Sequence, residues 1–198
     1  MGLDIDSTDG QTPIDEDEKD GILIATITTR SELDEFEQLG VEKALEWTLR
    51  RKPNLQQILT EDFIKELHRR MFADVWKWAG ALRTTNKNIG VDKYMIAPEL
   101  RNLLDDCTYW IDHKTFSEDE IAVRFSHRIV TIHPFANGNG RHSRLIADIL
   151  ILNGFGKPVF SWGSVNLTKK GEARSHYLAA LREADKINYA LLIQFARE

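Results

Sequence analysis

The sequence predicts an all-α domain with one β-hairpin. Over most of the chain after residue 30, apolar side chains recur every three or four residues, which places them on one face of a helix. Capping residues, prolines and Asn-Gly pairs separate these stretches, and such residues are typical of helix ends. Residues 86–97 lack the helical pattern and have Asn, Gly and Asp between short extended pieces, which favours a hairpin.

Composition limits the possible partners and compartment. A chain of 198 residues is expected to form one domain that buries roughly 70% of its unfolded surface. The formal net charge is −5 and no basic run is present, which argues against nucleic acid or an anionic membrane as a direct partner. The single cysteine cannot form an intramolecular disulfide, and no signal peptide or long apolar span is seen. We therefore expect a cytoplasmic protein.

The first 30 residues differ from the rest. Residues 1–20 are rich in Asp, Glu, Ser, Thr and Gly, and we expect a mobile acidic arm. Residues 22–27 are apolar and β-branched, so they predict either a strand-like segment docked on the body or an exposed interaction strip. Docking is favoured. The N-terminal arm is thus assigned to residues 1–30 and the domain to residues 31–198.

Two helical stretches precede the predicted hairpin. Ser31, with Asp34 three residues later, resembles an N-cap, and one or two helices follow over residues 31–52. Thr60 is expected to cap the next helix. The positions expected to face inward in that helix are Phe63, Ile64, Leu67 and Met71.

The helices after the hairpin show the same periodicity. Pro98 is expected to open a helix over residues 100–111, whose apolar stripe includes Cys107. Cys107 is therefore predicted to be a core residue and not a nucleophile. Ser117 and Glu120 form a capping-box pattern at the start of a helix that leads to residue 133. Further helices are expected after residue 144, ending at Asn153-Gly154, and around residues 169–184 and 187–197.

The residues best suited to catalysis or ligand binding are concentrated in one short segment. Residues 133–144 read His-Pro-Phe-Ala-Asn-Gly-Asn-Gly-Arg-His-Ser-Arg. Gly138 and Gly140 flank Asn139, so the backbone can take positive φ and bring its N–H groups close to an anion. If a helix starts near Asn139, its N-terminal amides and its dipole both favour an anion at that end. Arg141 and Arg144 then lie on one helical face, where they could hold consecutive phosphates.

His133 is a candidate base. Pro134 disfavours helix for His133 and projects it from the end of the preceding helix. The alternative is a plain connection whose glycines only serve the turn. Other site types are disfavoured, because a Walker loop needs Gly-Lys-Ser/Thr, a dinucleotide fingerprint needs a third glycine, and His127, His133 and His142 lack the spacing of a zinc site.

Position by position, this loop matches the Fic-family signature His-Pro-Phe-x-Asp/Asn-Gly-Asn-Gly-Arg-x-x-Arg. The resemblance covers about residues 31–198, and the layout resembles the bacterial subgroup called mobile mystery protein B. It implies a Fic-type helical bundle with one β-hairpin flap, and transfer of AMP from ATP to a hydroxyl side chain of a target protein. The Doc branch, which transfers a phosphoryl group, has Ala-Asn-Lys at residues 138–140, so this chain resembles the AMP-transferring branch.

The resemblance also implies roles for individual residues. His133 would be the general base, for which a neutral imidazole is suited. Arg144 would bind the outer phosphates of ATP, and Asn137 would help to hold Mg²⁺, although an amide is a weaker ligand than a carboxylate. The residues expected to stabilise charge on the phosphoryl oxygens are Gly138, Asn139, Gly140 and Arg141.

The hairpin at residues 86–97 lies where Fic proteins have the flap that registers the target chain, which fits strand addition. Ile89 and Gly90 would also border the adenine. Tyr177 and Asp185 match positions that line the base pocket in relatives. The alternatives are an ordinary surface hairpin and, for Tyr177, a core position.

Many Fic proteins are inhibited by a helix with the motif Ser/Thr-x-x-x-Glu-Gly/Asn, whose glutamate pairs with the final arginine of the signature, here Arg144. Residues 31–52 contain two imperfect matches, Glu35 and Glu37. Glu35 is followed by Phe36 where Gly or Asn belongs, and Glu37 is favoured because the Phe36-Glu37 pair resembles the Ile-Glu pair of relatives. The alternative is a solvated acidic helix face.

Other functions remain compatible with the sequence. The transferred group could be UMP, GMP or phosphoryl. The chain could instead be a toxin-antitoxin or mobile-element component with mainly a binding role, and the subgroup is associated with a helix-turn-helix neighbour protein.

Overall fold

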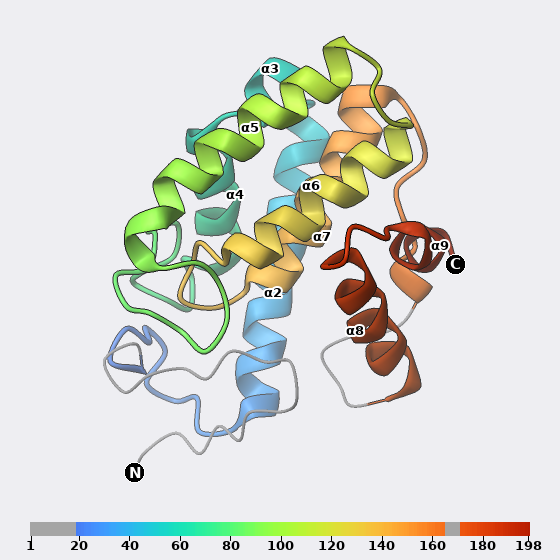
Figure 1. Ribbon diagram of the computed structural model, residues 1–198. Helices are drawn as coiled ribbons and strands as arrows, with labels where there is room; N and C mark the ends of the chain where they lie inside the picture. Colours follow the sequence, from blue (N-terminus) through green and yellow to red (C-terminus); the bar gives the residue numbers. More distant parts are fainter. Residues whose placement is uncertain (1–18, 165–170) are drawn as a thin grey trace.

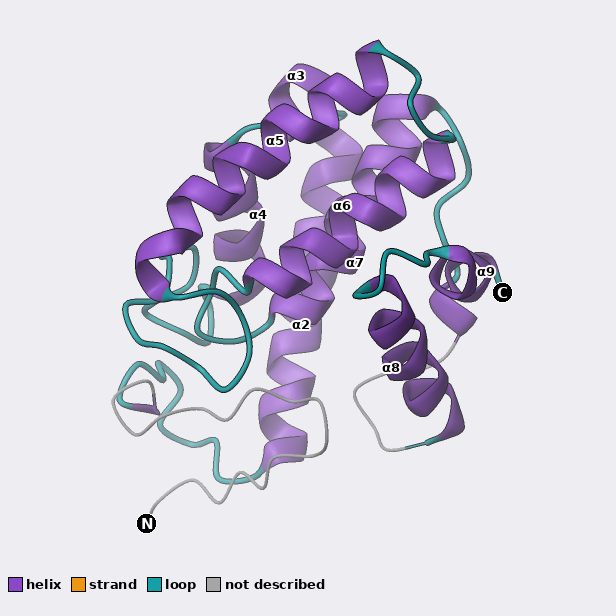
Figure 2. Cartoon of the chain, in the orientation of Figure 1, coloured by secondary structure: helices purple, strands orange, loops and turns teal. Residues whose placement is uncertain are grey.

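The computed structural model describes residues 19–164 and 171–198. Its α-helices are α2 (Arg30–Arg51), α3 (Leu55–Ile58), α4 (Glu61–Phe72), α5 (Ile96–Asp112), α6 (Glu118–Ile132), α7 (Asn139–Ile149), α8 (Glu172–Ala184) and α9 (Ala190–Arg197). Short 3-10 turns cover Lys93–Met95 and Trp162–Ser164, and a π-helical turn, Leu150–Gly154, continues α7. The predicted helical architecture is confirmed (Figures 1 and 2). Residues 1–18 of the acidic arm predicted over residues 1–20, and the start of the helix predicted from residue 169, lie outside the described residues.

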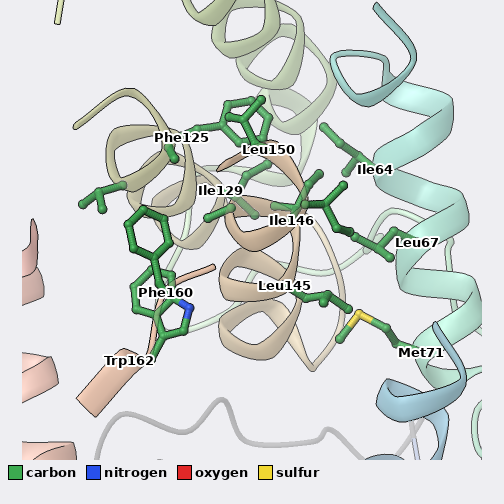
Figure 3. Packing of buried hydrophobic residues seen from close by; sticks show 14 of the residues in the cluster. Ile64, Leu67, Met71, Phe125, Ile129, Leu145, Ile146, Leu150, Phe160 and Trp162 are labelled. Atoms are coloured by element: carbon green, nitrogen blue, oxygen red, sulfur yellow. The ribbon is translucent and has the colours of Figure 1, made fainter. Parts of the chain in front are cut away.

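The centre of the bundle is the pair α6 and α7. These helices pack along one another, α4 lies against α7, α5 covers α6, and α9 reaches α6 from the other side. Figure 3 shows Leu67 of α4, Ile129 of α6 and Ile146 of α7 in one buried cluster. Because packing holds both helices, the loop that joins them is supported at both ends.

The cap of α2 differs from the prediction. Thr29 is the N-cap: its Oγ1 accepts the Glu32 N–H at 3.3 Å, and Glu32 Oε2 accepts the Thr29 N–H at 3.0 Å. The predicted cap at Ser31 is wrong, because the Glu32 carboxylate reaches back to Thr29 and completes the reciprocal box there. Ser31 consequently lies within the first helical turn.

Other helix starts agree more closely. Thr60 and Ser117 cap α4 and α6 through their side chains, as predicted. The helix expected over residues 100–111 begins earlier, at Ile96, so Pro98 lies inside its first turn. Proline is tolerated at that place because an amide there would have no partner within the helix.

The β-hairpin expected over residues 86–97 is not formed by paired strands; residues 86–95 contain bends and a 3-10 turn, and residues 96–97 begin α5. Side chains occupy the backbone groups that a strand ladder would use. Asn86 Oδ1 accepts the Lys93 N–H at 2.8 Å, and Asp92 Oδ1 accepts the Tyr94 N–H at 2.9 Å. Asn86 and Asp92 also bond to each other at 2.9 Å, which closes the segment as a side-chain-stabilised loop.

The apolar segment before α2 docks on the body, as expected. Ile22 forms an isolated antiparallel bridge with Trp76, and the Leu23 N–H bonds to the Val75 carbonyl at 2.8 Å. Ile27 is buried in the core. In the described part of the chain, β pairing is limited to this bridge.

Helix α5 carries the single cysteine. Cys107 is fully buried, and burial raises the pKa of its thiol to about 12. The prediction of a core role is confirmed, because such a thiol stays protonated at neutral pH. Neither α5 nor any other helix of the described segments is long and apolar enough to cross a membrane.

Candidate active site

His133 lies where α6 ends. It adopts a left-handed conformation, with φ 55° and ψ 60°, and its N–H closes the helix on the Ile129 carbonyl at 3.0 Å. Its ring Nδ1 lies 3.3 Å from the Val130 carbonyl oxygen. Because a carbonyl can only accept, this contact assigns the ring hydrogen to Nδ1 and leaves the lone pair on Nε2.

The environment of His133 keeps its imidazole neutral. The residue is only 4% exposed, and burial lowers its pKa to about 4. The Val130 hydrogen bond opposes this shift, whereas the positive charges of Arg83 and Lys87 add to it. At neutral pH the ring can therefore accept a proton.

Helix α7 starts at Asn139, within one residue of the predicted start, with Gly138 as its N-cap. Gly138 has φ 77°, and a Cβ there would lie 2.5 Å from Phe72 Cε2, so only glycine fits. At Gly140 the nearest heavy atom to an added Cβ would be Arg144 Nη1, at 3.7 Å. The first N–H groups of α7 point out of the helix end, as an anion site requires.

The side chain of Asn139 holds the loop. It is buried, its Oδ1 accepts the Phe135 N–H at 2.9 Å, and its Nδ2 donates to the Phe135 carbonyl at 2.8 Å. These two bonds bring the ends of the loop together. Any contribution of Asn139 to anion binding therefore comes from its backbone N–H.

His68 supports the loop from below, and the sequence analysis missed it. Its Nε2 donates to the Asn137 carbonyl at 3.0 Å, and its Nδ1 accepts the Gly80 N–H at 3.0 Å. Its ring stacks on the buried Phe135, with centroids 3.7 Å apart, so Phe135 packs beneath the loop. Burial holds the pKa of His68 well below 6.5. Its position four residues after Ile64, on the apolar face, was the available signal.

A buried glutamate reaches Arg141. Glu37 of α2 is 2% exposed; its Oε2 lies 2.6 Å from Arg141 Nη2, and its Oε1 accepts the Trp76 Nε1–H at 2.7 Å. Glu37 thus lies at the site, but the expected pairing with Arg144 is wrong. Arg141 sits over the Phe72 ring of α4, at 5.0 Å, and α2 packs on α4, so the carboxylate meets Arg141 first.

The second candidate, Glu35, does not join the site. Its side chain is on the exposed face of α2, whereas Glu37, two residues on, points into the protein. Residues two apart on a helix point in directions that differ by about 200°. Only one of the two glutamates can therefore face the loop.

Arg144 points toward α8. Its Cζ lies 5.3 Å from the centroid of the buried Tyr177 ring, which also packs against Trp162 and Phe195. The structure thus brings Tyr177 to the loop. Asp185 follows the end of α8, about two turns farther on, and its Oδ1 lies 2.9 Å from His127 Nε2.

The loop over residues 83–92 lies against His133. Gly90 has φ 95°, and a Cβ there would be 2.6 Å from His133 Cβ. Ile89 is 41% exposed beside it. Arg83, which the sequence analysis also missed, is buried between this segment and the end of α6. Figure 1 shows both loops at the same end of the bundle.

Asn137 is the candidate metal ligand. It is half-buried, and its Oδ1 accepts the Gly138 N–H at 2.5 Å. The oxygen keeps a second lone pair, so Asn137 fits as a single neutral ligand of a hard cation. Within residues 19–164 and 171–198, no group of three or more His, Cys, Asp or Glu side chains is arranged to hold a metal ion.

Comparison with known families shows which family has this motif. Residues 58–151 match the model of the Fic/DOC family. The chain contains a Fic domain. The match runs from the end of α3 to the π-helical turn and so includes the whole loop from His133 to Arg144.

Similar curated proteins share this Fic domain. The protein adenylyltransferase fic-1 of Caenorhabditis briggsae is 34% identical over an alignment of 131 residues, which covers 63% of this chain and 24% of that protein. The protein adenylyltransferase Fic of Nematostella vectensis is 30% identical over 135 residues, covering 66% of this chain and 31% of that protein. The chain therefore spans only about a quarter to a third of the length of these relatives.

Solved structures establish the same fold. Fic-1 of C. elegans (residues 134–508 of that protein) superposes with a TM-score of 0.64 at 24% identity, covering 80% of this chain and 46% of that one. The BepC protein of Bartonella tribocorum with bound AMPPNP has a TM-score of 0.64 at 18% identity, covering 92% and 97%. The helical bundle around the loop is thus the arrangement of known Fic domains.

Proposed function

We propose that this Fic domain transfers AMP from ATP to a hydroxyl side chain of a target protein. The observation that carries the proposal is a buried, neutral His133 at one end of the loop whose other end is the N-terminus of α7, the helix that contains Arg141 and Arg144. Two similar proteins are named protein adenylyltransferases. Structures of the same fold were solved with bound ADP and AMPPNP.

In this mechanism the target hydroxyl oxygen attacks the α-phosphorus of ATP. The bond between that phosphorus and the pyrophosphate oxygen breaks, and the hydroxyl proton passes to His133 Nε2. A pKa of about 4 keeps this nitrogen unprotonated at neutral pH. A positioned base contributes about 10²- to 10⁴-fold in rate.

The remaining barrier comes from charge on the phosphate oxygens. The N–H groups of Asn139, Gly140 and Arg141 at the start of α7 would bind these oxygens without reorganisation. The guanidinium groups of Arg141 and Arg144 would bind the outer phosphates. Asn137 would help to hold Mg²⁺, which when bound would neutralise part of the phosphate charge.

The flap and base pocket extend this proposal. Ile89 and Gly90 would align the target chain and border the adenine, and Gly90 already packs on His133. This flap acts as a loop, without the paired strands that the sequence predicts. Tyr177 and Asp185 would line the base pocket, and the proposal is better supported for Tyr177, which touches Arg144, than for Asp185, which pairs with His127.

Glu37 would inhibit transfer. Both of its carboxylate oxygens are bound, one by Arg141 and one by Trp76, so the carboxylate occupies a donor meant for phosphate. ATP would have to displace it before its phosphates could reach Arg141. Bound without that contact, ATP would lack the productive orientation of its α-phosphate.

The proposed reaction is tested by His133→Ala. This variant should bind ATP like the wild type but transfer nothing, because the ring is needed only for proton removal. Calorimetry measures binding, and mass spectrometry of lysate proteins incubated with ATP measures transfer, including whether the added mass is AMP or phosphoryl. The exposed His113, changed to Ala, is the control. Transfer by His133→Ala at the wild-type rate would exclude His133 as the base.

A further inference from the structure

A buried arginine, Arg83, joins residues 85–91, here called the flap loop, to the end of α6. Arg83 is 5% exposed, and its Nε donates to the His133 carbonyl at 2.6 Å. Its Nη1 donates to the Thr85 carbonyl at 2.8 Å, and its Nη2 to the carbonyls of Val91 and, at 3.5 Å, Ile132. One guanidinium therefore binds two carbonyls of the flap loop and two at the helix end.

Backbone hydrogen bonds also join the flap loop to the end of α6. The Arg83 N–H bonds to the Pro134 carbonyl at 2.9 Å, and the Val91 N–H bonds to the Ile132 carbonyl at 3.3 Å. A Cβ on Gly90 would lie 2.6 Å from His133 Cβ and 2.9 Å from Arg83 Nη2. The flap loop, Arg83 and His133 thus share one close-packed contact.

The guanidinium suits this position for two reasons. The last carbonyls of a helix have no partner within it and carry partial negative charge, which a cation satisfies. The planar fork of Arg also directs its five N–H groups to several acceptors at once, whereas Lys supplies a single ammonium. Charge alone would be reproduced by Lys, but the geometry would not.

We propose that Arg83 is a positioning residue for transfer: it sets the position of the flap loop relative to His133, and hence the distance from the target hydroxyl to His133 Nε2. This inference rests on the proposed function, in which the flap aligns the target chain. A misplacement of about 1 Å can cost roughly 10²-fold in rate. Arg83 does not itself contact the reacting atoms.

The test compares Arg83→Lys with Arg197→Lys. Arg197 also binds several groups, namely the carboxylate of Asp119 and the carbonyls of Pro158 and Val159, away from the loop. We expect Arg83→Lys to lower kcat by about 10²-fold with the KM for ATP unchanged. Arg197→Lys should lower stability in urea without changing kcat. Wild-type kcat in folded Arg83→Lys would overturn the proposal.

Two further measurements do not depend on transfer. In Arg83→Gln, exchange of the Val91 amide hydrogen should become faster because the flap is released. The pKa of His133, followed by NMR, should rise because a nearby positive charge is removed. Unchanged values of both would overturn the positioning role, even if the wild type transfers no AMP and the proposed function fails.

A second variant covers the case in which Arg83→Lys does not fold. Gly90→Ala leaves Arg83 intact, but its Cβ would press on His133 and displace the flap. We expect the same loss of kcat. A folded Gly90→Ala protein with wild-type kcat and wild-type exchange at Val91 would show that the position of the flap does not matter.

Discussion

The two arginines of the motif, both in the first turns of α7, lie in opposite environments although they are one helical turn apart. Arg141 faces α2 and forms an ion pair with the buried Glu37 at 2.6 Å. Arg144 faces α8 and lies over the ring of Tyr177 at 5.3 Å. Among the described residues, no carboxylate is within ion-pair distance of Arg144. Two arginines of the same motif can therefore have different neighbours in the folded chain.

Because their surroundings differ, we expect the contact of Arg141 with Glu37 to regulate ATP binding and Arg144 to serve binding alone. On the α2 side, the phosphate of the proposed reaction would have to compete with a carboxylate whose two oxygens are both occupied. On the α8 side, an aromatic face supports the guanidinium without neutralising its charge. We expect substitutions on the α2 side to change both stability and ATP affinity, and those on the α8 side to change mainly affinity.

Arg141→Ala should have the largest effect. It leaves Glu37 buried without its cation, which costs about 3–5 kcal/mol of stability. Arg144→Ala should cost less than about 1 kcal/mol, because a partly exposed cation–π contact contributes roughly that much. Urea unfolding measures both. The double variant Glu37→Gln/Arg141→Ala should recover part of the loss, and equal destabilisation by the two single arginine variants would contradict the comparison.

Glu37→Gln should have the next largest effect. The amide keeps an oxygen for Trp76 but no longer holds Arg141 by charge, so ATP binds without displacing a carboxylate. We expect ATP affinity to rise about tenfold, equivalent to ~1.4 kcal/mol. Calorimetry with the wild type, Glu37→Gln and the exposed Glu35→Gln provides the test. A matching gain in Glu35→Gln would show that net charge is responsible.

Tyr177→Leu should act more weakly. It removes the ring beneath Arg144, a contact that contributes about 0.5–1 kcal/mol, so ATP affinity should fall two- to fivefold. Tyr177→Phe keeps the ring and serves as the control. If Tyr177→Phe binds ATP as weakly as Tyr177→Leu, then the hydroxyl of Tyr177, and not its stacking on Arg144, supports the site.

The pH dependence of stability and of transfer should depend on the buried histidines and not on the two arginines, which stay charged. Burial lowers the pKa of His133 and His142 to about 4, below the value of an unfolded chain. Their contribution to stability is therefore complete above about pH 6.5 and is lost as pH falls toward 4. The transfer rate should change little between pH 8 and about pH 5, since His133 stays neutral. An inflection near pH 6.5 in the rate profile would contradict the low pKa.

The features that the sequence predicted correctly depend on residues that are close together in the chain. The caps at Thr60 and Ser117, the buried stripes of α4 and α6 and the start of α7 depend on residues within one or two turns of each other. The hairpin and the Ser31 cap failed for the same kind of reason, because Asp92 and Glu32 side chains bound backbone groups in arrangements that compete with the predicted ones.

By itself, the sequence determined that the chain is helical and that His133, two glycines and two arginines lie together in residues 133–144, because periodicity and spacing are local properties. Only the tertiary structure decided which arginine meets Glu37. Those residues are 104 positions apart, and His68 and Asn137 are 69 apart. Such contacts depend on how α2 packs on α4 and α4 on α7, which residues close together in the sequence do not determine.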